Sequence, residues 1–189
     1  MKVSVFFVAL LLTTPAFAQA GDPQAAANSF YTVYGAQHRG GIPDATERLR
    51  YSGVLTPRLN KQLSDAASTQ DRLTARMKGQ SAKNAVPPML EGDIFSSLFE
   101  GATAWKVGAC TGDGKTARCP VALTHVDQPQ NPSQPGKPPA KPANWNDTLL
   151  LANTPQGWKV DDVIYDAGFA FGNTGRLSDM LNMVVASNP

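Results

Sequence analysis

The chain has 189 residues, of which 42% are hydrophobic and 17% are charged, and its formal net charge is +2. This composition provides enough apolar material for a core, and it excludes a collagen, a coiled coil and a wholly disordered chain. The weak net charge also argues against a nucleic-acid partner, because proteins that follow a phosphate backbone carry a basic patch or stripe. At about 150 residues per domain, the length predicts one domain.

The first residues have the features of a secretory signal peptide. Lys2 precedes the apolar run 3–12, and Ala16-Phe17-Ala18 supplies the small residues that a signal peptidase requires. A membrane anchor needs about 20 apolar residues, roughly twice this run. We therefore expect residues 1–18 to be removed after Ala18, with cleavage after Ala20 as the alternative. No Cys lies near either cut, so we expect a periplasmic or secreted protein that is not a lipoprotein.

We expect the mature chain to form one domain over 22–187. Helix signals dominate the first half of this domain. Asp22-Pro23 is a typical helix start, with a capping residue before a proline at the first helical position. Asp44-Ala45-Thr46-Glu47 is a capping-box pattern that predicts a short helix. Thr56-Pro57 begins the clearest amphipathic helix. Asp93 is predicted to cap a further short helix.

The second half has the alternation of β-strands, and four strands are predicted over 104–110, 118–126, 145–152 and 158–165. A final helix is predicted with Asn173 or Thr174 as its cap. Helices followed by an antiparallel sheet and a closing helix make an α+β fold.

Six prolines fall in the segment 127–144, which is inserted between the second and third predicted strands. Their spacing of about three residues is typical of polyproline II. Such a segment can be a docking peptide for an aromatic groove or a stiff solvated loop, and we favour the loop because Pro-rich linkers need no partner.

Cys110 and Cys119 are the two cysteines of the chain. They flank a turn rich in glycine, and an exported protein meets an oxidising compartment, so the sequence predicts a disulfide near the closed end of a hairpin. A zinc site is disfavoured because His38 and His125 lack a zinc-finger spacing, and a redox pair is disfavoured because the C-x-x-C spacing is absent.

Four short stretches of this order resemble the nuclear transport factor 2-like (cystatin-like) fold, and more narrowly an uncharacterised family of small exported bacterial proteins. The stretches are Phe30 with Tyr34, Leu55-Thr56-Pro57-Arg58-Leu59, Gly92-Asp93-Ile94-Phe95-Ser96 and Trp158-Lys159-Val160-Asp161-Asp162-Val163-Ile164-Tyr165. The resemblance implies N-terminal helices that wrap a curved antiparallel sheet of about four strands into a cone with a pocket. It implies no activity, because members include isomerases, dehydratases, binding modules and inhibitory partner proteins.

Asp162 is the leading candidate for chemistry. Strict alternation places it on one strand face with Trp158, Val160 and Ile164, where desolvation would raise its pKa as a general base requires. The structural alternative is a carboxylate that caps a backbone turn or pairs with an arginine such as Arg39 or Arg50, and we favour it.

His125 could complete a dyad with Asp162, although a histidine at a strand end is more often solvated. If Cys110 and Cys119 are opposed, the hairpin register places His125 opposite Ala104.

Aromatic side chains are the candidates for lining a ligand pocket, although at these spacings they are more often core. The candidates are Tyr34, Trp105, Trp158 and Tyr165, together with Trp145.

No G-x-S-x-G or H-E-x-x-H motif occurs, so the sequence predicts neither a serine hydrolase nor a metal site, and no cofactor. We expect an exported module that binds a small ligand or a protein partner. One alternative is a small isomerase or hydrolase that uses Asp162 with His125 or Tyr165. Another is an immunity-type inhibitor of a secreted toxin, recognisable by an exposed apolar or acidic patch.

Overall fold

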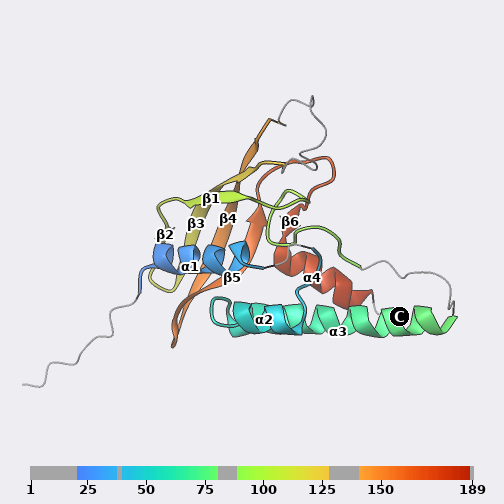
Figure 1. The fold of residues 1–189 in the computed structure, drawn as a ribbon. Helices are drawn as coiled ribbons and strands as arrows, with labels where there is room; N and C mark the ends of the chain where they lie inside the picture. Colours follow the sequence, from blue (N-terminus) through green and yellow to red (C-terminus); the bar gives the residue numbers. More distant parts are fainter. Residues whose placement is uncertain (1–20, 38–39, 81–88, 128–140, 188–189) are drawn as a thin grey trace, which may run out of the picture.

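The computed structural model describes residues 21–37, 40–80, 89–127 and 141–187 (Figure 1). The expected signal peptide with its cleavage site at Ala18 lies outside these residues, and so do residues 128–140 of the Pro-rich segment. Within the described ranges, no helix combines the length and the apolarity needed to cross a bilayer. Three helices, a six-stranded antiparallel sheet and a closing helix follow one another, which confirms the α+β prediction.

The three N-terminal helices are α1 (Pro23–Gly35), α2 (Ala45–Tyr51) and α3 (Pro57–Gln80). The first two begin directly after their predicted capping residues, and α3 begins at the predicted Thr56-Pro57 start. Asp22 accepts a hydrogen bond from the backbone N–H of Gln24 at 3.0 Å. Asp44 and Glu47 form the complete capping box. Each cap satisfies backbone donors that the first helical turn leaves without a partner, so local sequence fixes these helix starts.

The sheet has the strand order β1-β3-β4-β5-β6, and β2 pairs with β3 beyond β1. The strands are β1 (Ala104–Val107), β2 (Thr111–Gly112), β3 (Thr116–His125), β4 (Ala143–Thr154), β5 (Gly157–Tyr165) and β6 (Gly175–Arg176). The four predicted strands are present with shifted ends, whereas the two-residue strands β2 and β6 were not predicted. We call the face that α1 crosses the inner face, since α1 contacts β1, β3, β4 and β5 there (Figure 1).

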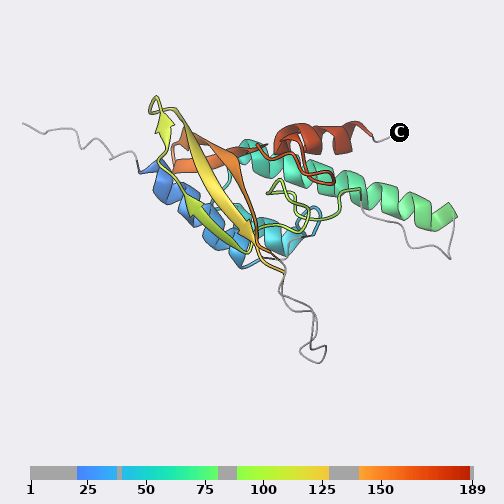
Figure 2. The same ribbon diagram turned by 90° about the horizontal axis from the view of Figure 1, so that it is seen from above.

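The closing helix α4 (Leu177–Ala186) packs along α3 and also contacts β5. Seen from above, α3 begins beside the sheet and continues well beyond it, with α4 alongside (Figure 2). The sheet and α1 therefore make one part of the body, and the α3–α4 pair extends from it.

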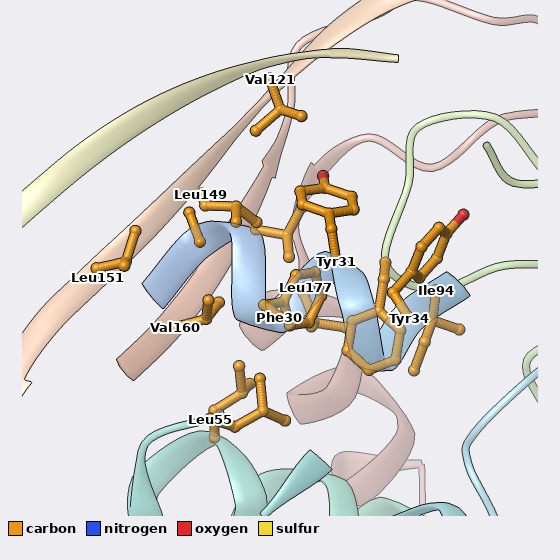
Figure 3. Close-up of a cluster of buried hydrophobic side chains, with 14 of the residues drawn as sticks. Phe30, Tyr31, Tyr34, Leu55, Ile94, Val121, Leu149, Leu151, Val160 and Leu177 are labelled. Atoms are coloured by element: carbon orange, nitrogen blue, oxygen red, sulfur yellow. The ribbon is translucent and has the colours of Figure 1, made fainter. Parts of the chain in front are cut away.

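The core lies between α1 and the inner face, and it is rich in aromatic rings. Phe30, Tyr31 and Tyr34 of α1 project among aliphatic side chains that include Val121 and Leu149 (Figure 3). All five side chains are almost fully buried. Fully burying one such side chain stabilises the fold by about 1.5–3 kcal/mol, so the contact of α1 with the sheet is a major source of stability.

The predicted short helix at Asp93 is absent, and residues 91–100 form bends and turns instead. Asp93 accepts a hydrogen bond from the backbone N–H of Phe95 at 2.7 Å, and its own N–H donates to the carbonyl oxygen of Phe99 at 2.7 Å. The side chain of Asp93 therefore stabilises a turn, which competes with helix formation.

The closing helix begins later than predicted, and neither Asn173 nor Thr174 caps it. Residues 175–176 form β6, and Arg176 is the N-cap position without a side-chain hydrogen bond to the helix. Asn173 instead donates through Nδ2 to the carbonyl oxygens of Asp93 and Ser96, at 2.6 and 2.7 Å. This asparagine is used in tertiary contacts, so its local capping preference is overridden.

A β-bulge in β5 reverses the alternation on which the prediction for Asp162 depended. Leu151 pairs with Val160, whereas Leu150 pairs with Asp162, so Asp161 is an extra residue in β5. Paired residues share a face of the sheet, so Asp162 lies on the face of Leu150, opposite to that of Val160. The expectation that Trp158, Val160, Asp162 and Ile164 share one face is therefore wrong.

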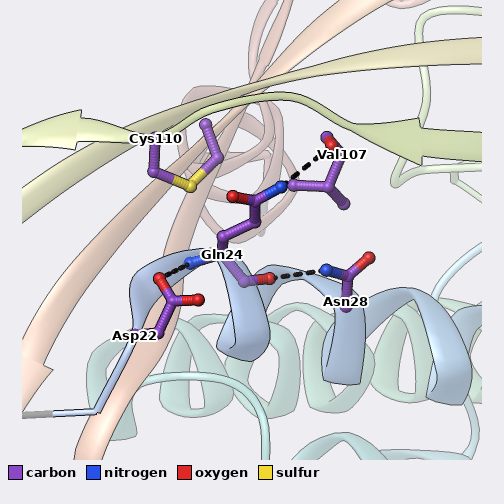
Figure 4. Close-up of a disulfide and its surroundings, with 6 residues drawn as sticks. Asp22, Gln24, Asn28, Val107 and Cys110 are labelled. Carbon is purple, nitrogen blue, oxygen red and sulfur yellow. Dashed lines mark hydrogen bonds between the residues drawn. A yellow bond between two sulfur atoms is a disulfide. The ribbon is translucent and has the colours of Figure 1, made fainter.

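The predicted disulfide between Cys110 and Cys119 is present, with a Cα–Cα distance of 4.2 Å (Figure 4). It joins the segment after β1 to β3, and the turn that follows β2 is held by Asp113. Gln24 of α1 donates from Nε2 to the carbonyl oxygen of Val107 at 3.3 Å beside the disulfide. The start of α1 is thus tied to this end of the sheet.

Candidate functional site

Asp162 is buried, and its carboxylate caps α4. Oδ1 accepts hydrogen bonds from the backbone N–H groups of Ser178 and Val163 at 3.0 Å each, and Oδ2 accepts from the Ser178 hydroxyl at 2.5 Å. Ser178 is in the first turn of α4, where a negative charge is also favoured by the helix dipole. Of the alternatives drawn from the sequence, the geometry matches a carboxylate that caps backbone N–H groups.

The neighbouring Asp161 makes the ion pair that the sequence suggested for Asp162, but with a different arginine. Arg58 contacts its Oδ2 at 2.8 Å, and the Thr56 hydroxyl donates to its Oδ1 at 2.6 Å. Burial raises the pKa of Asp161, but the hydrogen bonds from Arg58 and Thr56 and the charge of Arg58 outweigh it, so the pKa is below its usual range. The two carboxylates of the β5 bulge therefore fix the starts of α3 and α4.

His125 and Asp162 do not come together. His125 pairs with Ala143 and Asp162 pairs with Leu150, seven residues apart along β4. At about 3.3 Å per residue, this separates them by roughly 23 Å along the strand.

His125 instead contacts the carbonyl oxygen of Gly101 through Nδ1 at 2.6 Å and Oδ1 of Asp127 through Nε2 at 3.2 Å. Thr124, not His125, lies opposite Ala104. The pairing with β3 is interrupted between β1 and β2, and it resumes in β2 shifted by one residue. The register counted back from the disulfide is therefore wrong by one residue in β1.

The aromatic side chains proposed for a ligand pocket belong to the packed core or lie against it. Tyr34 donates to Oδ2 of Asp93 at 2.6 Å and accepts from the backbone N–H of Ala102 at 2.7 Å. Tyr165 donates to the carbonyl oxygen of Ile94 at 2.5 Å, Trp158 is buried, and Trp105 stacks on Tyr31 at 5.5 Å between ring centroids. Tyr34 borders a space of about 10 Å³, which is close to the volume that holds one water molecule.

Asp147 is a fully buried carboxylate that the sequence analysis did not select. It accepts hydrogen bonds from the Ser97 backbone N–H at 2.8 Å, Trp145 Nε1 at 3.0 Å and the Asp166 backbone N–H at 3.1 Å, and also from the Ser97 hydroxyl. We call Asp147 with these three partner residues the Asp147 cluster. Burial raises the pKa of Asp147, although every one of these hydrogen bonds acts in the opposite direction.

Tyr31 lies close enough to the Asp147 cluster for the charge of Asp147 to affect its pKa. Its hydroxyl is buried and has no hydrogen-bond partner within the part of the chain that the structure describes. Burial raises the pKa of Tyr31 well above its usual value, and the negative charges of Asp147 and Asp93 raise it further. Tyr31 is therefore a neutral phenol at neutral pH.

The Asp147 cluster fixes two loops that form an apolar groove of about 310 Å³. We call it the aromatic groove, and its lining residues are Leu98, Phe99, Glu100, Phe169, Ala170, Phe171 and Gly172.

Hydrogen bonds and a close approach of the backbones hold the two loops together. The N–H of Asn173 donates to the carbonyl oxygen of Ser97 at 2.9 Å, and the N–H of Ala167 donates to the Ser97 hydroxyl at 3.3 Å. A side chain at Gly172 would overlap the Ser97 carbonyl oxygen, so the close approach of the loops needs glycine there. The Phe169 ring meets Trp145 edge-on with centroids 5.6 Å apart.

The groove exposes large apolar side chains to solvent. Phe171 is 91% exposed and Phe99 is 42% exposed, although both lie in loops that buried hydrogen bonds hold in place. The sequence signal was Gly168-Phe169-Ala170-Phe171-Gly172, a loop in which two phenylalanines stand between glycines. Aromatic side chains in a core are shielded from solvent, whereas those of a fixed surface loop are exposed to it. Exposed aromatic side chains on a fixed loop are typical of binding sites.

A larger depression of about 520 Å³ lies on the outer face of the sheet, near the hairpin of β2 and β3. Its walls include Arg118, Leu150 and Asp161 but no aromatic side chain. Asp161 there is already paired with Arg58, so this depression offers fewer groups for recognition than the aromatic groove does.

Within the described residues, no cluster of three or more His, Cys, Asp or Glu side chains is arranged to hold a metal ion. No protein-family model matches the chain, and no curated protein matches it.

Proposed function

We propose that the mature protein is an exported, non-enzymatic module that binds a partner through the aromatic groove, on a scaffold of the nuclear transport factor 2-like type. Export is supported by the signal-peptide pattern at residues 1–18 and by the disulfide, since disulfides persist in oxidising compartments. The scaffold is supported by the order of helices and antiparallel strands. The four stretches on which the resemblance rests also contact one another, because Tyr34 binds Asp93, Thr56 binds Asp161 and Tyr165 binds Ile94.

The contrast between the filled interior and the exposed groove carries this proposal. Between α1 and the sheet, aromatic and aliphatic side chains occupy the space that a cone-shaped site would need. The aromatic groove has about 310 Å³, within the range of roughly 300–1,000 Å³ that ligand sites occupy. Burial of the Phe171 side chain by a partner would contribute to the binding free energy, because about 25 cal/mol are gained per Å² of apolar surface removed from water.

Two observations weigh against the acid–base enzyme. The carboxylate of Asp162 is engaged by Ser178 and Val163, and His125 is roughly 23 Å away along the strands. A general base must reach a substrate proton, and neither side chain lines the aromatic groove.

An immunity-type inhibitor of a secreted toxin is the second candidate function. The observation that favours it is the combination of exposed Phe171 with the exposed carboxylate of Glu100 in one groove, since such an inhibitor presents an apolar or acidic patch. It differs from the first candidate only in what the partner is.

A capture experiment with matched variants tests the proposed function. Wild type, Phe171→Ala and Met183→Ala are immobilised, exposed to extract of the exported fraction, and the retained proteins are identified by mass spectrometry. Met183 is the control because it is an apolar side chain of α4 that is 66% exposed. A partner retained by wild type and Met183→Ala but lost with Phe171→Ala is expected. Equal retention by all three would reject the groove as the binding site.

A further inference from the structure

We infer that the aromatic groove accepts a cationic segment of another polypeptide, in which apolar side chains enter the groove and Lys or Arg side chains lie at its rim. This inference rests on the proposed function, since it names the chemistry of the partner at that same groove. It follows from the charges around the groove, from their exposure and from the open shape of the site.

The groove-lining parts of the chain are acidic, although the whole chain is slightly basic. The segments 89–103 and 165–175, which contain the lining residues, carry Glu91, Asp93, Glu100 and Asp166 but no Lys or Arg. The formal net charge of the chain is +2, so this is a local asymmetry. A region of one sign attracts partners of the opposite sign and raises their rate of association.

Three of the surrounding carboxylates are exposed and belong to segments next to the Leu98–Glu100 side of the groove. Glu100 is itself a lining residue. Glu91 precedes Gly92, where an added Cβ would overlap the Phe99 ring, so this part of the backbone passes close to that ring. Asp127 contacts His125, which in turn contacts the carbonyl oxygen of Gly101, next to Glu100.

Among the described residues at this end of the sheet, three exposed cations oppose these carboxylates: Lys106 in β1, Lys141 before β4 and Arg176 in β6. The lining of the groove itself carries the carboxylate of Glu100 and no Lys or Arg, so its charge is negative. The rings of Phe99, Phe169 and Phe171 add to it, because the face of an aromatic ring attracts Lys and Arg cations.

The shape of the site favours a polypeptide over a small amine. Small-molecule sites enclose about 70–90% of the ligand surface, whereas Phe171 stands 91% exposed at the edge of this groove. An exposed aromatic side chain on a fixed loop is typical of the few residues that carry most of the free energy of a protein–protein interface. The Asp147 cluster holds the loops in place, so little ordering would oppose binding.

Selection from a library of random peptides displayed on phage, with the purified wild-type protein as target, tests the inference. We expect the selected peptides to combine apolar residues with Lys or Arg. The affinities of synthesised peptides are then measured by calorimetry and by tryptophan fluorescence, because Trp145 contacts the Phe169 ring. Phe171→Ala should weaken binding by about tenfold, as expected for an aromatic anchor residue. Glu100→Gln should weaken it by a smaller factor and reduce the salt dependence of binding, as expected for a charge at the rim.

The controls remove an apolar group or a charge elsewhere on the surface. Met183→Ala and Asp71→Asn, in α4 and α3, should leave the affinity unchanged. Selected peptides that are neutral or acidic but still need Phe171 would overturn the cationic partner and leave the proposed function standing. Peptides whose binding is insensitive to Phe171→Ala would overturn both. An alkyltrimethylammonium salt that binds as tightly as the peptides would overturn the polypeptide assignment.

Discussion

The two ends of the sheet are held together in different ways. At the end formed by β2 and the start of β3, a disulfide joins Cys110 to Cys119, and the exposed Asp113 accepts hydrogen bonds from Lys115 and Thr116. At the opposite end, the buried Asp147 accepts its hydrogen bonds from Ser97, Trp145 and Asp166. We call these the hairpin end and the groove end.

The difference shows that burial can reverse the direction in which the pKa of a hydrogen-bonded carboxylate is shifted. The hydrogen bonds from Thr116 and Lys115 hold the pKa of Asp113 below its usual range. Asp147 also accepts several hydrogen bonds, yet burial raises its pKa. The hairpin end is thus stabilised by a covalent bond and by an exposed carboxylate in its turn, whereas the groove end depends on buried polar contacts that are expensive to leave unpaired.

The largest effect is expected from Asp147→Ala. It leaves the buried donors of Ser97 and Trp145 and the part-buried N–H of Asp166 without an acceptor, and each unpaired buried donor costs about 1–3 kcal/mol. Because these losses are not additive, we expect a decrease of about 3–5 kcal/mol in the free energy of unfolding, measured by urea denaturation.

Asp147→Asn replaces the alanine variant in this measurement if the alanine variant does not fold. Asparagine keeps the shape and one acceptor oxygen, so its free energy of unfolding should lie between those of wild type and Asp147→Ala. Asp113→Ala is the matched control, because it removes an exposed carboxylate with similar partners. Equal losses at Asp113 and Asp147 would contradict the role assigned to burial.

The disulfide should contribute less than Asp147. Its sequence separation is nine residues, so it closes a short loop, for which the loop-entropy model gives at most about 2–3 kcal/mol. Replacing both Cys110 and Cys119 by Ser should lower the melting temperature without preventing folding. Reductant should lower the melting temperature of wild type towards that of the variant and leave the variant unchanged. Free thiols in denatured, unreduced wild type would contradict the pairing.

The hairpin end was predictable because its information is local. The cysteine spacing and the turn residues between Cys110 and Cys119 lie within ten residues of sequence, and the same holds for the capping signals of α1 and α2. The groove end depends on contacts between distant residues, such as Ser97 with Asp147 and Asp93 with Asn173. No local pattern reveals such partners, and this explains the wrong expectations of a helix at Asp93 and a cap at Asn173.

A signal for Asp147 was nevertheless present. In the alternation Trp145, Asp147, Leu149, Leu151, the carboxylate occupies an otherwise apolar face, which is the pattern that drew attention to Asp162. The pattern holds in β4, which has no irregularity before Leu150, and it fails in β5, where the bulge at Asp161 moves Asp162 to the other face. A carboxylate on an apolar strand face is thus a useful signal of a buried polar cluster. Asp147 lies on the inner face as the alternation predicts, whereas the bulge places Asp162 on the opposite face.

Asp162→Ala should have a smaller effect than Asp147→Ala. It leaves the N–H groups of Ser178 and Val163 and the Ser178 hydroxyl without their acceptor, and loss of a cap costs about 1–2 kcal/mol. Asp162→Asn keeps an acceptor oxygen but loses the charge near the helix dipole, so it should cost about 0.3–1 kcal/mol at pH 7. Thermal melts of both variants measure this order. An Asp162→Asn variant that melts above wild type would favour a strained, functional carboxylate instead.

Tyr31→Phe should stabilise the protein, which distinguishes Tyr31 from its neighbours at the groove end. The Tyr31 hydroxyl is buried without a hydrogen-bond partner among the described residues, and an unsatisfied buried hydroxyl costs about 1–3 kcal/mol. Phenylalanine keeps the ring contact with Trp105 and removes the hydroxyl. We expect a gain of about 1 kcal/mol by urea denaturation. Tyr34→Phe is the control, and it should destabilise because that hydroxyl binds Asp93 and Ala102.

The smallest effect is a difference in pH dependence between the two ends. The folded state lowers the pKa of Asp113, so its ionised form contributes stability at neutral pH that is lost as the pH falls through this lowered pKa. The folded state raises the pKa of Asp147, so its contribution is greatest below the usual value of 3.8 and declines as the pH rises through the raised pKa. The destabilisation caused by Asp113→Asn should therefore shrink between pH 7 and pH 3, whereas that caused by Asp147→Asn should grow. Free energies of unfolding at a series of pH values in this interval measure both trends. Parallel trends for the two variants would mean that Asp147 has the solvent contact of a surface carboxylate, which contradicts its burial in the structure.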